Sequence, residues 1–309
     1  MPAGSRPKVI LAVCTYYRNE PLTLLLERAA ELSRTHWASV EIGVTVVDDS
    51  PEGQARPVAD RMRERFPLGL EYCQCGHGNI SLARNMAIEN AMHRGDFIAM
   101  TDDDCEPHTE WLSELMSVQA ATGAQAATGL MLRRAPEHAP RWLTEQPFLE
   151  LGEFDAKDGQ DLETGYTNNC LLKSSVIRDN PQLRFDPALG KTGGEDMVFF
   201  QNFRKAGNRI AFAANAFVYE NEPDERLTLN YQLGRYFWHG NSSIVTSLRA
   251  GQSRPRMGIH AGATIARAAL HPLRRIGSGK RPQLLYSLAK LSEGLGKLVG
   301  VFGVQVDHH

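Results

Sequence analysis

Apolar and amphipathic segments alternate through the first half of the chain. Short apolar runs of the kind that form buried strands occur at residues 9–15, 44–47, 68–73 and 97–100. Between and after them, apolar residues recur every three or four positions and predict helices at 21–35, 58–66, 81–94 and 110–121. Gly95 ends the third of these helices, and Thr109 is expected to cap the fourth. Strands that alternate with helices indicate a parallel sheet covered on both faces.

The pattern loosens after residue 130 into Pro-rich and charged segments that extend to about residue 163. Beyond them we expect a strand, a helix and two short strands at 166–173, 194–206, 209–213 and 217–220. From residue 227 the chain reads as helical, with later helices at about 257–270 and 283–301 and a breaker at 275–282. The sequence therefore predicts an α/β fold with a mixed central sheet and a helical C-terminal region.

Three consecutive acids, Asp102, Asp103 and Asp104, directly follow the apolar run 97–100. Open α/β sheets bind their ligands at the carboxyl ends of strands. Adjacent carboxylates repel one another and are costly to bury without a cation. Mg²⁺ and Mn²⁺ prefer such oxygen ligands, which they share with phosphate groups. The acids therefore indicate a divalent-metal site, and a solvated acidic turn is the alternative.

Polar residues also follow the other predicted strands. They occur in the segments CTYYRNEP (Thr15, Tyr16, Arg18, Asn19), VVDDSPEG (Asp48, Asp49), SLARNMAIENA (Arg84, Asn85) and TDDDCEP. This ordered set resembles the nucleotide-sugar-binding half of family 2 glycosyltransferases, which have the GT-A fold, and the resemblance covers about residues 9–249. The segments GYTNNCLLK, GKTGGEDMVFF and IAFAANAFVYENEPDER are similar to glucosyltransferases of succinoglycan-type exopolysaccharide assembly.

The resemblance implies a role for each acid of the run. Asp104 matches the direct metal ligand, and Asp102 matches the acid that faces the ribose and the metal. A metal there would stabilise the charge that develops on the nucleotide diphosphate as the glycosidic bond breaks. Asp103 is grouped with the nucleotide-sugar-binding residues, with a solvated neighbour as the alternative.

The same resemblance implies a nucleotide pocket. Asp49 matches the acid that accepts a hydrogen bond from uracil, Thr15 and Tyr16 line that pocket, and Arg18 belongs to the same group. Arg84 matches an arginine that reaches toward the nucleotide or its phosphates. An Asx turn at residues 48–49 and a surface salt bridge at Arg84 are the structural alternatives.

A second acidic pair, Glu195 and Asp196, begins the helix predicted at 194–206. Transfer to a sugar hydroxyl needs a base, and Asp196 is the leading candidate, with Glu195 beside it. Gly193 and Gly194 permit a close approach of substrate to the backbone. With one carboxylate base and no second nucleophile motif, the family resemblance implies single displacement with inversion. First-turn acids that only complement the helix dipole are the alternative.

Further residues are assigned to the acceptor or diphosphate side of the site. Part of this set lies in YQLGRYFWHGN, where processive relatives carry a QxxRW motif and this chain has Tyr236 in place of its Trp. His239 is either an additional metal ligand or a packed residue. The set consists of Asn169, Gly194, Arg235, Trp238 and His239.

Composition and charge predict where in the cell the protein works and which partners it meets. The 309 residues are 42% hydrophobic and 23% charged, with a formal charge of −2. From Arg249 to the end, ten Lys or Arg residues face only two acids, which favours contact with an anionic membrane surface. A helical cap whose apolar face packs on the main domain is the alternative. Nucleic acid is not expected as a partner, because the tail has few aromatic residues. Five cysteines without CxxC spacing and the lack of a signal peptide or membrane-spanning segment predict a cytoplasmic protein.

The sequence thus predicts a glycosyltransferase that uses Mn²⁺ or Mg²⁺ to transfer a sugar, with glucose from UDP as the leading choice. The expected acceptor is an oligosaccharide linked to a polyprenyl-diphosphate lipid. The GT-A domain covers residues 1–226, with a nucleotide half at about 8–110 and an acceptor half at about 111–226, and the helical region covers 227–309. A sugar-phosphate nucleotidyltransferase and a non-catalytic carbohydrate-binding protein remain the alternatives.

Overall fold

The computed structural model describes residues 6–150 and 156–307, which form two compact units. Unit 1 contains the described residues of 6–132, 156–190 and 195–220. Unit 2 contains those of 133–150, 191–194 and 221–307. The predicted boundary after residue 226 lies near the start of the long segment of unit 2. The segments 133–150 and 191–194, which the sequence placed in the acceptor half, also belong to unit 2.

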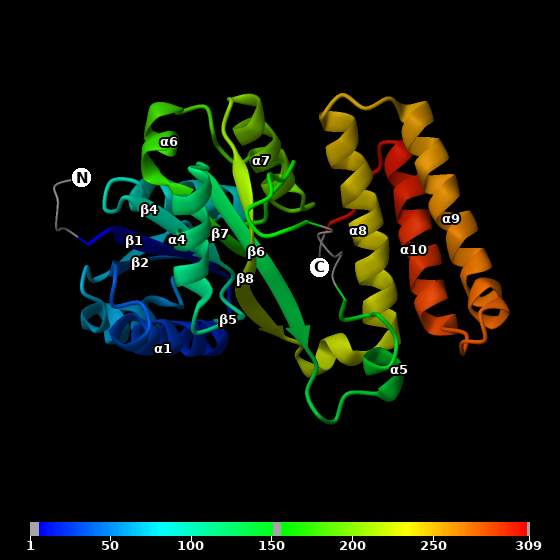
Figure 1. Cartoon of the computed structure of the whole chain (residues 1–309), viewed down its shortest axis with the longest axis horizontal. Helices are drawn as coiled ribbons and strands as arrows, with labels where there is room; N and C mark the ends of the chain where they lie inside the picture. The colour runs from blue at the N-terminus through cyan, green and yellow to red at the C-terminus, as the bar shows by residue number, and fades with distance from the viewer. Residues whose placement is uncertain (1–5, 151–155, 308–309) are drawn as a thin grey trace. The chain divides into compact units, whose positions relative to one another are not determined.

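Unit 1 is built on a mixed eight-stranded sheet with the strand order β3-β2-β1-β4-β7-β6-β8-β5 (Figure 1). Its strands are β1 (Lys8–Thr15), β2 (Glu41–Asp48), β3 (Leu70–Gln74), β4 (Phe97–Thr101), β5 (Cys105–Pro107), β6 (Ala126–Arg134), β7 (Asn169–Lys173) and β8 (Ile210–Asn221). The first four strands pair in parallel, and β4 pairs with β7 in antiparallel register. The predicted mixed sheet is confirmed.

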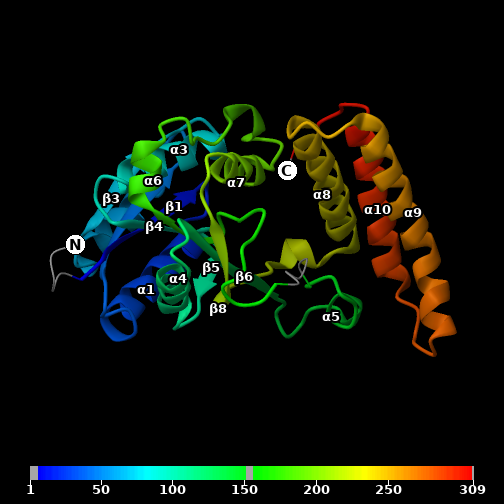
Figure 2. The ribbon, with the colours of Figure 1, turned by 45° about the horizontal axis from the view of Figure 1, so that its top comes forward.

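Helices cover both faces of this sheet (Figure 2). They are α1 (Asn19–Thr35), α2 (Arg56–Met62), α3 (Ile80–Ala91), α4 (Trp111–Thr122), α6 (Ser174–Asp179) and α7 (Glu195–Lys205), with short 3₁₀ turns η1 (Arg63–Arg65) and η2 (Pro187–Leu189). Alternate residues of β1 divide the core: Val9 and Leu11 pack with α1, α2 and α4, whereas Ile10 and Ala12 pack with α3, α6 and α7. Because both faces of the first strands are buried, their sequence reads as continuous apolar runs.

Several predicted element boundaries are wrong. The strands expected at 209–213 and 217–220 form the single strand β8, and the strands β5 and β6 were not predicted. Thr109 does not cap α4, because Glu110 holds the N-cap position and makes no side-chain capping bond. The helix ends at Gly123, which has a φ of 68° that favours glycine.

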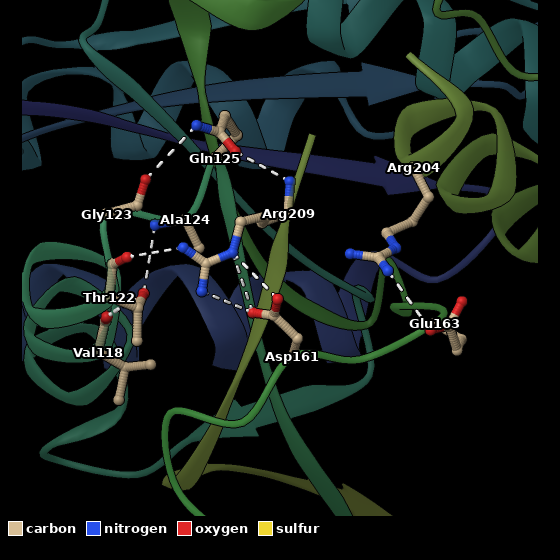
Figure 3. A network of polar contacts seen from close by, with 9 residues as sticks. All are labelled: Val118, Thr122, Gly123, Ala124, Gln125, Asp161, Glu163, Arg204 and Arg209. Atoms are coloured by element: carbon tan, nitrogen blue, oxygen red, sulfur yellow. Dashed lines mark hydrogen bonds and ion pairs between the residues drawn. The ribbon is translucent and has the colours of Figure 1, made fainter. Parts of the chain in front are cut away.

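A polar network attaches the segment that begins at residue 156 to the sheet (Figure 3). The guanidinium of Arg209, at the start of β8, binds both carboxylate oxygens of Asp161 and the carbonyl oxygen of Thr122. Gln125 accepts a hydrogen bond from the Arg209 backbone nitrogen at 2.9 Å. Arg204 of α7 pairs with Glu163 at 3.4 Å. These contacts hold residues 161–163 beside strands and helices that are distant in sequence.

Unit 2 consists mainly of three long helices, α8 (Leu229–Arg249), α9 (Arg254–Gly277) and α10 (Leu284–Val301). The short helix α5 (Arg141–Thr144) and the 3₁₀ turn η3 (Asp224–Leu227) belong to the same unit. Helix α10 packs along both α8 and α9 (Figure 1). The predicted helices are confirmed, but α9 continues to Gly277, so the predicted breaker begins only at Ser278. Within the described residues, no helix is both long and apolar enough to cross a membrane.

Candidate active site

The three acids after β4 have different surroundings in unit 1. The Asp103 carboxylate is buried, accepts a hydrogen bond from the Thr15 hydroxyl at 2.7 Å, and lies 3.2 Å from Nη1 of Arg18. Burial and the neighbouring Asp104 raise the pKa of Asp103 to about 7, although Arg18 and Thr15 oppose the shift. The alternative of a solvated neighbour is therefore wrong. Asp103 joins the end of β1 to the end of β4.

Asp102 and Asp104 both have solvent access. The Asp104 side chain is 17% exposed and pairs with Nη1 of Arg18 at 2.8 Å. The Asp102 side chain is 42% exposed, and its Oδ1 lies 3.2 Å from Nη2 of Arg84. Two accessible carboxylates thus stand at the strand end, each beside an arginine.

Arg84 connects the strand-end acids to the acidic pair of α7. Its side chain is buried in α3 and donates hydrogen bonds to Asp102 and to Glu195, which is 111 positions further along the chain. Burial opposes the charge of Arg84, but Glu195, Asp102 and Asp196 together raise its pKa. The alternative of a surface salt bridge is therefore wrong. The buried Oε2 of Glu195 has no hydrogen-bond partner among the described residues.

Asp196 is the partly exposed member of the acidic pair. Its Oδ1 accepts a hydrogen bond from the backbone nitrogen of Met197 at 2.7 Å. Burial and Glu195 raise the pKa of Asp196 to about 7, whereas Arg84 and the Met197 nitrogen lower it. A carboxyl group that titrates near neutral pH is suited to proton transfer. Successive helical residues point differently, and here Glu195 is directed at Arg84 while Asp196 keeps solvent access.

The two acids at the end of β2, Asp48 and Asp49, have different hydrogen-bond partners. Asp48 forms the Asx turn, because its Oδ1 accepts hydrogen bonds from both the backbone nitrogen and the hydroxyl of Ser50. Asp49 instead accepts hydrogen bonds from the backbone nitrogens of His77 and Asn79, at 2.9 and 2.5 Å. The Asp49 carboxylate therefore holds the loop that leads into α3.

Two exposed tyrosines lie near this loop, and only Tyr16 is among the residues predicted from the sequence. Tyr16 and Tyr17 are 50% and 46% exposed, and their ring centroids are 4.5 Å apart. Tyr17 is the one described residue other than glycine with positive φ, at 56°. Its hydroxyl donates to Glu52 at 2.6 Å. Strained backbone directly after a strand is a signal that residue patterns do not reveal.

The structure gives Asn169 a different role from the predicted one on the acceptor side of the site. The residue is fully buried, and its side-chain amide donates to the carbonyl oxygens of Leu130 and Ala216, at 2.9 and 2.8 Å. Its Oδ1 accepts a hydrogen bond from the Trp111 indole at 2.8 Å. Asn169 therefore fastens β6, β8 and α4 to β7, and its amide is used within the fold.

The glycines before α7 also require a different explanation. Gly193 and Gly194 have φ values of 77° and 86° and belong to unit 2. A Cβ on Gly193 would lie 2.3 Å from the Trp238 ring, and one on Gly194 would lie 2.3 Å from the Thr246 methyl group. In the structure, the close approach that these glycines permit is to α8.

The remaining predicted residues of α8 stay within unit 2. Trp238 donates from Nε1 to the Thr192 carbonyl at 3.2 Å, and its ring lies 4.8 Å from that of His239, which is exposed. Arg235 pairs with the buried Glu222 at 3.2 Å, and Glu222 also binds Arg133. Arg235 thus has a structural partner.

The carboxylates at the end of β4 could hold a divalent ion only if an external ligand completed its coordination. Within the described residues, no three His, Cys, Asp or Glu side chains are grouped as metal ligands. Mg²⁺ characteristically uses one or two carboxylates and completes its coordination with phosphate oxygens and water. Asp104 and Asp102, with their solvent access, match that pattern.

The fold and the acids at its sheet edge define a glycosyltransferase with the GT-A fold. Residues 11–179 match the model of glycosyl transferase family 2. The chain is 36% identical over 235 residues to the succinoglycan biosynthesis protein ExoM of Rhizobium meliloti, an alignment that covers 75% of this chain and 72% of that protein. The chain therefore belongs to glycosyl transferase family 2.

More distant proteins are also similar to this chain in sequence or in structure. A glucosyl-dolichyl phosphate glucuronosyltransferase of Haloferax volcanii is 23% identical over 253 residues, which are 78% of each chain. The mannosyltransferase PcManGT of Pyrobaculum calidifontis, solved with GDP-Man and Mn²⁺, aligns over 97% of this chain and 88% of its own with a TM-score of 0.61 and 15% identity. S. aureus TarS 1–349, solved with UDP, aligns over 94% and 89% with a TM-score of 0.52 and 17% identity.

Proposed function

We propose that this protein is a metal-dependent, inverting hexosyltransferase that moves a sugar, with glucose as the leading choice, from a UDP-sugar to a lipid-linked oligosaccharide in exopolysaccharide synthesis. The observation that carries the proposal is the cluster of charges in unit 1, in which Arg84 pairs with Asp102 and Glu195 and interacts with Asp196, while Asp104 pairs with Arg18. The similarity to ExoM supports the choice of exopolysaccharide. Five free cysteines are consistent with a cytoplasmic site of action.

The donor would bind at the strand ends of unit 1. Asp104 and Asp102 would hold Mn²⁺ or Mg²⁺, which supplies charge neutralisation for the departing nucleotide diphosphate when bound. Arg18, which pairs with Asp103 and Asp104, would then be placed to donate to phosphate oxygens. Tyr16 and Tyr17 offer exposed rings against which a nucleobase can stack.

The acceptor hydroxyl would meet Asp196. In the unprotonated state, Asp196 takes the proton of the hydroxyl as its oxygen attacks the anomeric carbon opposite the diphosphate. Glu195 places negative charge beside Asp196 and keeps its proton affinity high, whereas Arg84 opposes this effect and pairs with Glu195 at the helix start. A single base without a covalent nucleophile leads to inversion at the anomeric carbon.

A donor screen tests this proposal. The purified protein is incubated with UDP-, GDP- and dTDP-sugars, and nucleotide release is measured with Mn²⁺, with Mg²⁺ and with chelator. We expect a UDP-sugar to be hydrolysed only with metal, and Asp104→Ala to abolish metal-linked UDP binding in calorimetry. Asp60→Ala, which removes an exposed acid that pairs with Arg63, is the matched control and should leave binding unchanged. Equal UDP binding with and without chelator would contradict the proposal.

A further inference from the structure

Helices α9 and α10 carry most of the exposed large apolar side chains in the described chain. Of fourteen such side chains, ten lie between residues 259 and 304. They are Ile259, Leu270, Leu273, Ile276, Leu284, Leu288, Leu295, Leu298, Phe302 and Val304. On α10 they recur at helical spacing and form one stripe, and on α9 they cluster opposite the buried residues. We call these ten residues the outer apolar face.

The inward side of α10 has the opposite character. Its buried residues are Ser287, Ala289, Gly294, Gly296, Lys297 and Gly300. A Cβ on Gly296 would lie 1.9 Å from the Phe237 carbonyl oxygen, so α8 and α10 approach closely through small residues. Helices in water bury their leucines, whereas small residues inside and apolar residues outside are typical of helices packed in lipid. The sequence arrangement of α10 therefore suits an apolar environment on its outer side.

The basic residues of α9 supply the second observation. The helix has five arginines and no acidic residue. Arg256, Arg267 and His260 line a groove of about 460 Å³, together with Met257, Ile259 and Ala263. Burial, Lys297 and Arg267 lower the pKa of His260, as expected where positive charge gathers. The groove thus places an apolar wall beside cationic groups.

We propose that the outer apolar face and the arginines of α9 dock unit 2 onto the surface of an anionic membrane. The apolar side chains contact the acyl region, and Arg256 and Arg267 bind lipid phosphates from the groove. A second copy of the chain is the competing occupant. In a two-fold dimer the same surface faces itself, so the arginines of α9 would meet without acids to offset them, and an anionic surface offers the complementary charge. The inference deepens the proposed function and rests on it for the lipid-linked acceptor.

Vesicle sedimentation tests the docking surface. The full-length protein is mixed with phosphatidylcholine vesicles, with or without phosphatidylglycerol. We expect binding only to the phosphatidylglycerol vesicles, weaker at higher salt, and lost by at least tenfold in the double variant Leu273→Glu, Leu295→Glu. Arg267→Gln should weaken binding about fivefold, the equivalent of about 1 kcal/mol for one basic group. Leu24→Glu, at an exposed leucine of α1, is the matched control and should bind as the wild type does.

Two further measurements make the result decisive. Circular dichroism and donor hydrolysis should be unchanged in the double variant, which shows that it folds and that donor chemistry is independent of docking. A wild type that stays in the supernatant at low salt would overturn the inference. So would light scattering that shows a dimer which Leu295→Glu dissociates, because the face would then be a subunit interface. Vesicle binding without any donor hydrolysis would instead overturn the proposed function alone.

Discussion

Units 1 and 2 both bury polar groups, but they do so in opposite settings. In unit 1, two apolar clusters fill both faces of a sheet, and the buried charges gather at one edge around Arg84 and Asp103. In unit 2, small and polar residues lie buried along the length of α10, and four of its leucines, Leu284, Leu288, Leu295 and Leu298, are exposed. The first pattern is that of an apolar core with a charged site at one edge, and the second is that of a helix that keeps large apolar side chains exposed.

The difference shows how to separate structural from functional polar residues. Burying an ion pair costs more in desolvation than a surface pair does, and its attraction does not always offset that cost. The Arg84 cluster therefore needs a reason beyond stability, and its position at the strand ends supplies one. The exposed leucines of unit 2 need an external reason, because water alone would favour their burial.

The largest effect is expected from Arg84→Ala in unit 1. The change leaves the buried Glu195 carboxylate without its cation, so the free energy of unfolding should fall by about 3–5 kcal/mol. Urea denaturation measures this change. Arg63→Ala breaks an exposed pair with Asp60 and should cost no more than about 1 kcal/mol. If the two variants lost the same stability, the cluster would not be a buried ion-pair site.

A smaller effect is expected where the helices of unit 2 approach closely. Gly296→Ala places a methyl group against the Phe237 carbonyl and should destabilise the protein by about 1–3 kcal/mol. Gly262→Ala on α9 meets open space and should stabilise it by about 0.5–1 kcal/mol, since alanine favours a helix over glycine. Thermal unfolding compares the two variants. Equal shifts of the same sign would mean that α8 and α10 are not tightly packed.

Local patterns predicted most of the first sheet. Apolar runs that end in polar residues placed β1 to β4, and helical periodicity placed α1, α3 and α10. The failures involve partners distant in sequence: Glu195 lies 111 positions from Arg84, and Asn169 binds carbonyl groups of two other strands. A residue type gives no sign of such a partner, and the sequence therefore predicts a ligand contact for Asn169 where the structure has a buried amide bonded within the fold. The basic, leucine-containing tail predicts an amphipathic surface in this region, but the sequence does not show which leucines remain exposed. The structure shows this for the outer apolar face.

The pH dependence of turnover tests the central claim, that Asp196 is the base. Burial and Glu195 raise its pKa to about 7, and a base acts only when unprotonated, so turnover should rise as pH increases through 7. Protein stability should change in the opposite direction, because the pKa of Asp196 is higher in the folded than in the unfolded state. The stability that protonated Asp196 contributes is fully present below the unfolded-state pKa, and it is lost as pH rises through the folded-state pKa of about 7.

The most direct measurement is single-turnover transfer by Asp196→Asn, with UDP binding followed by calorimetry on the same sample. We expect donor binding to be retained, while turnover falls by about two orders of magnitude or more and loses its rise through pH 7. Glu195→Gln is the matched control and should keep a pH-dependent rate. Near-normal turnover in Asp196→Asn together with an inactive Glu195→Gln would contradict the assignment and make Glu195 the base.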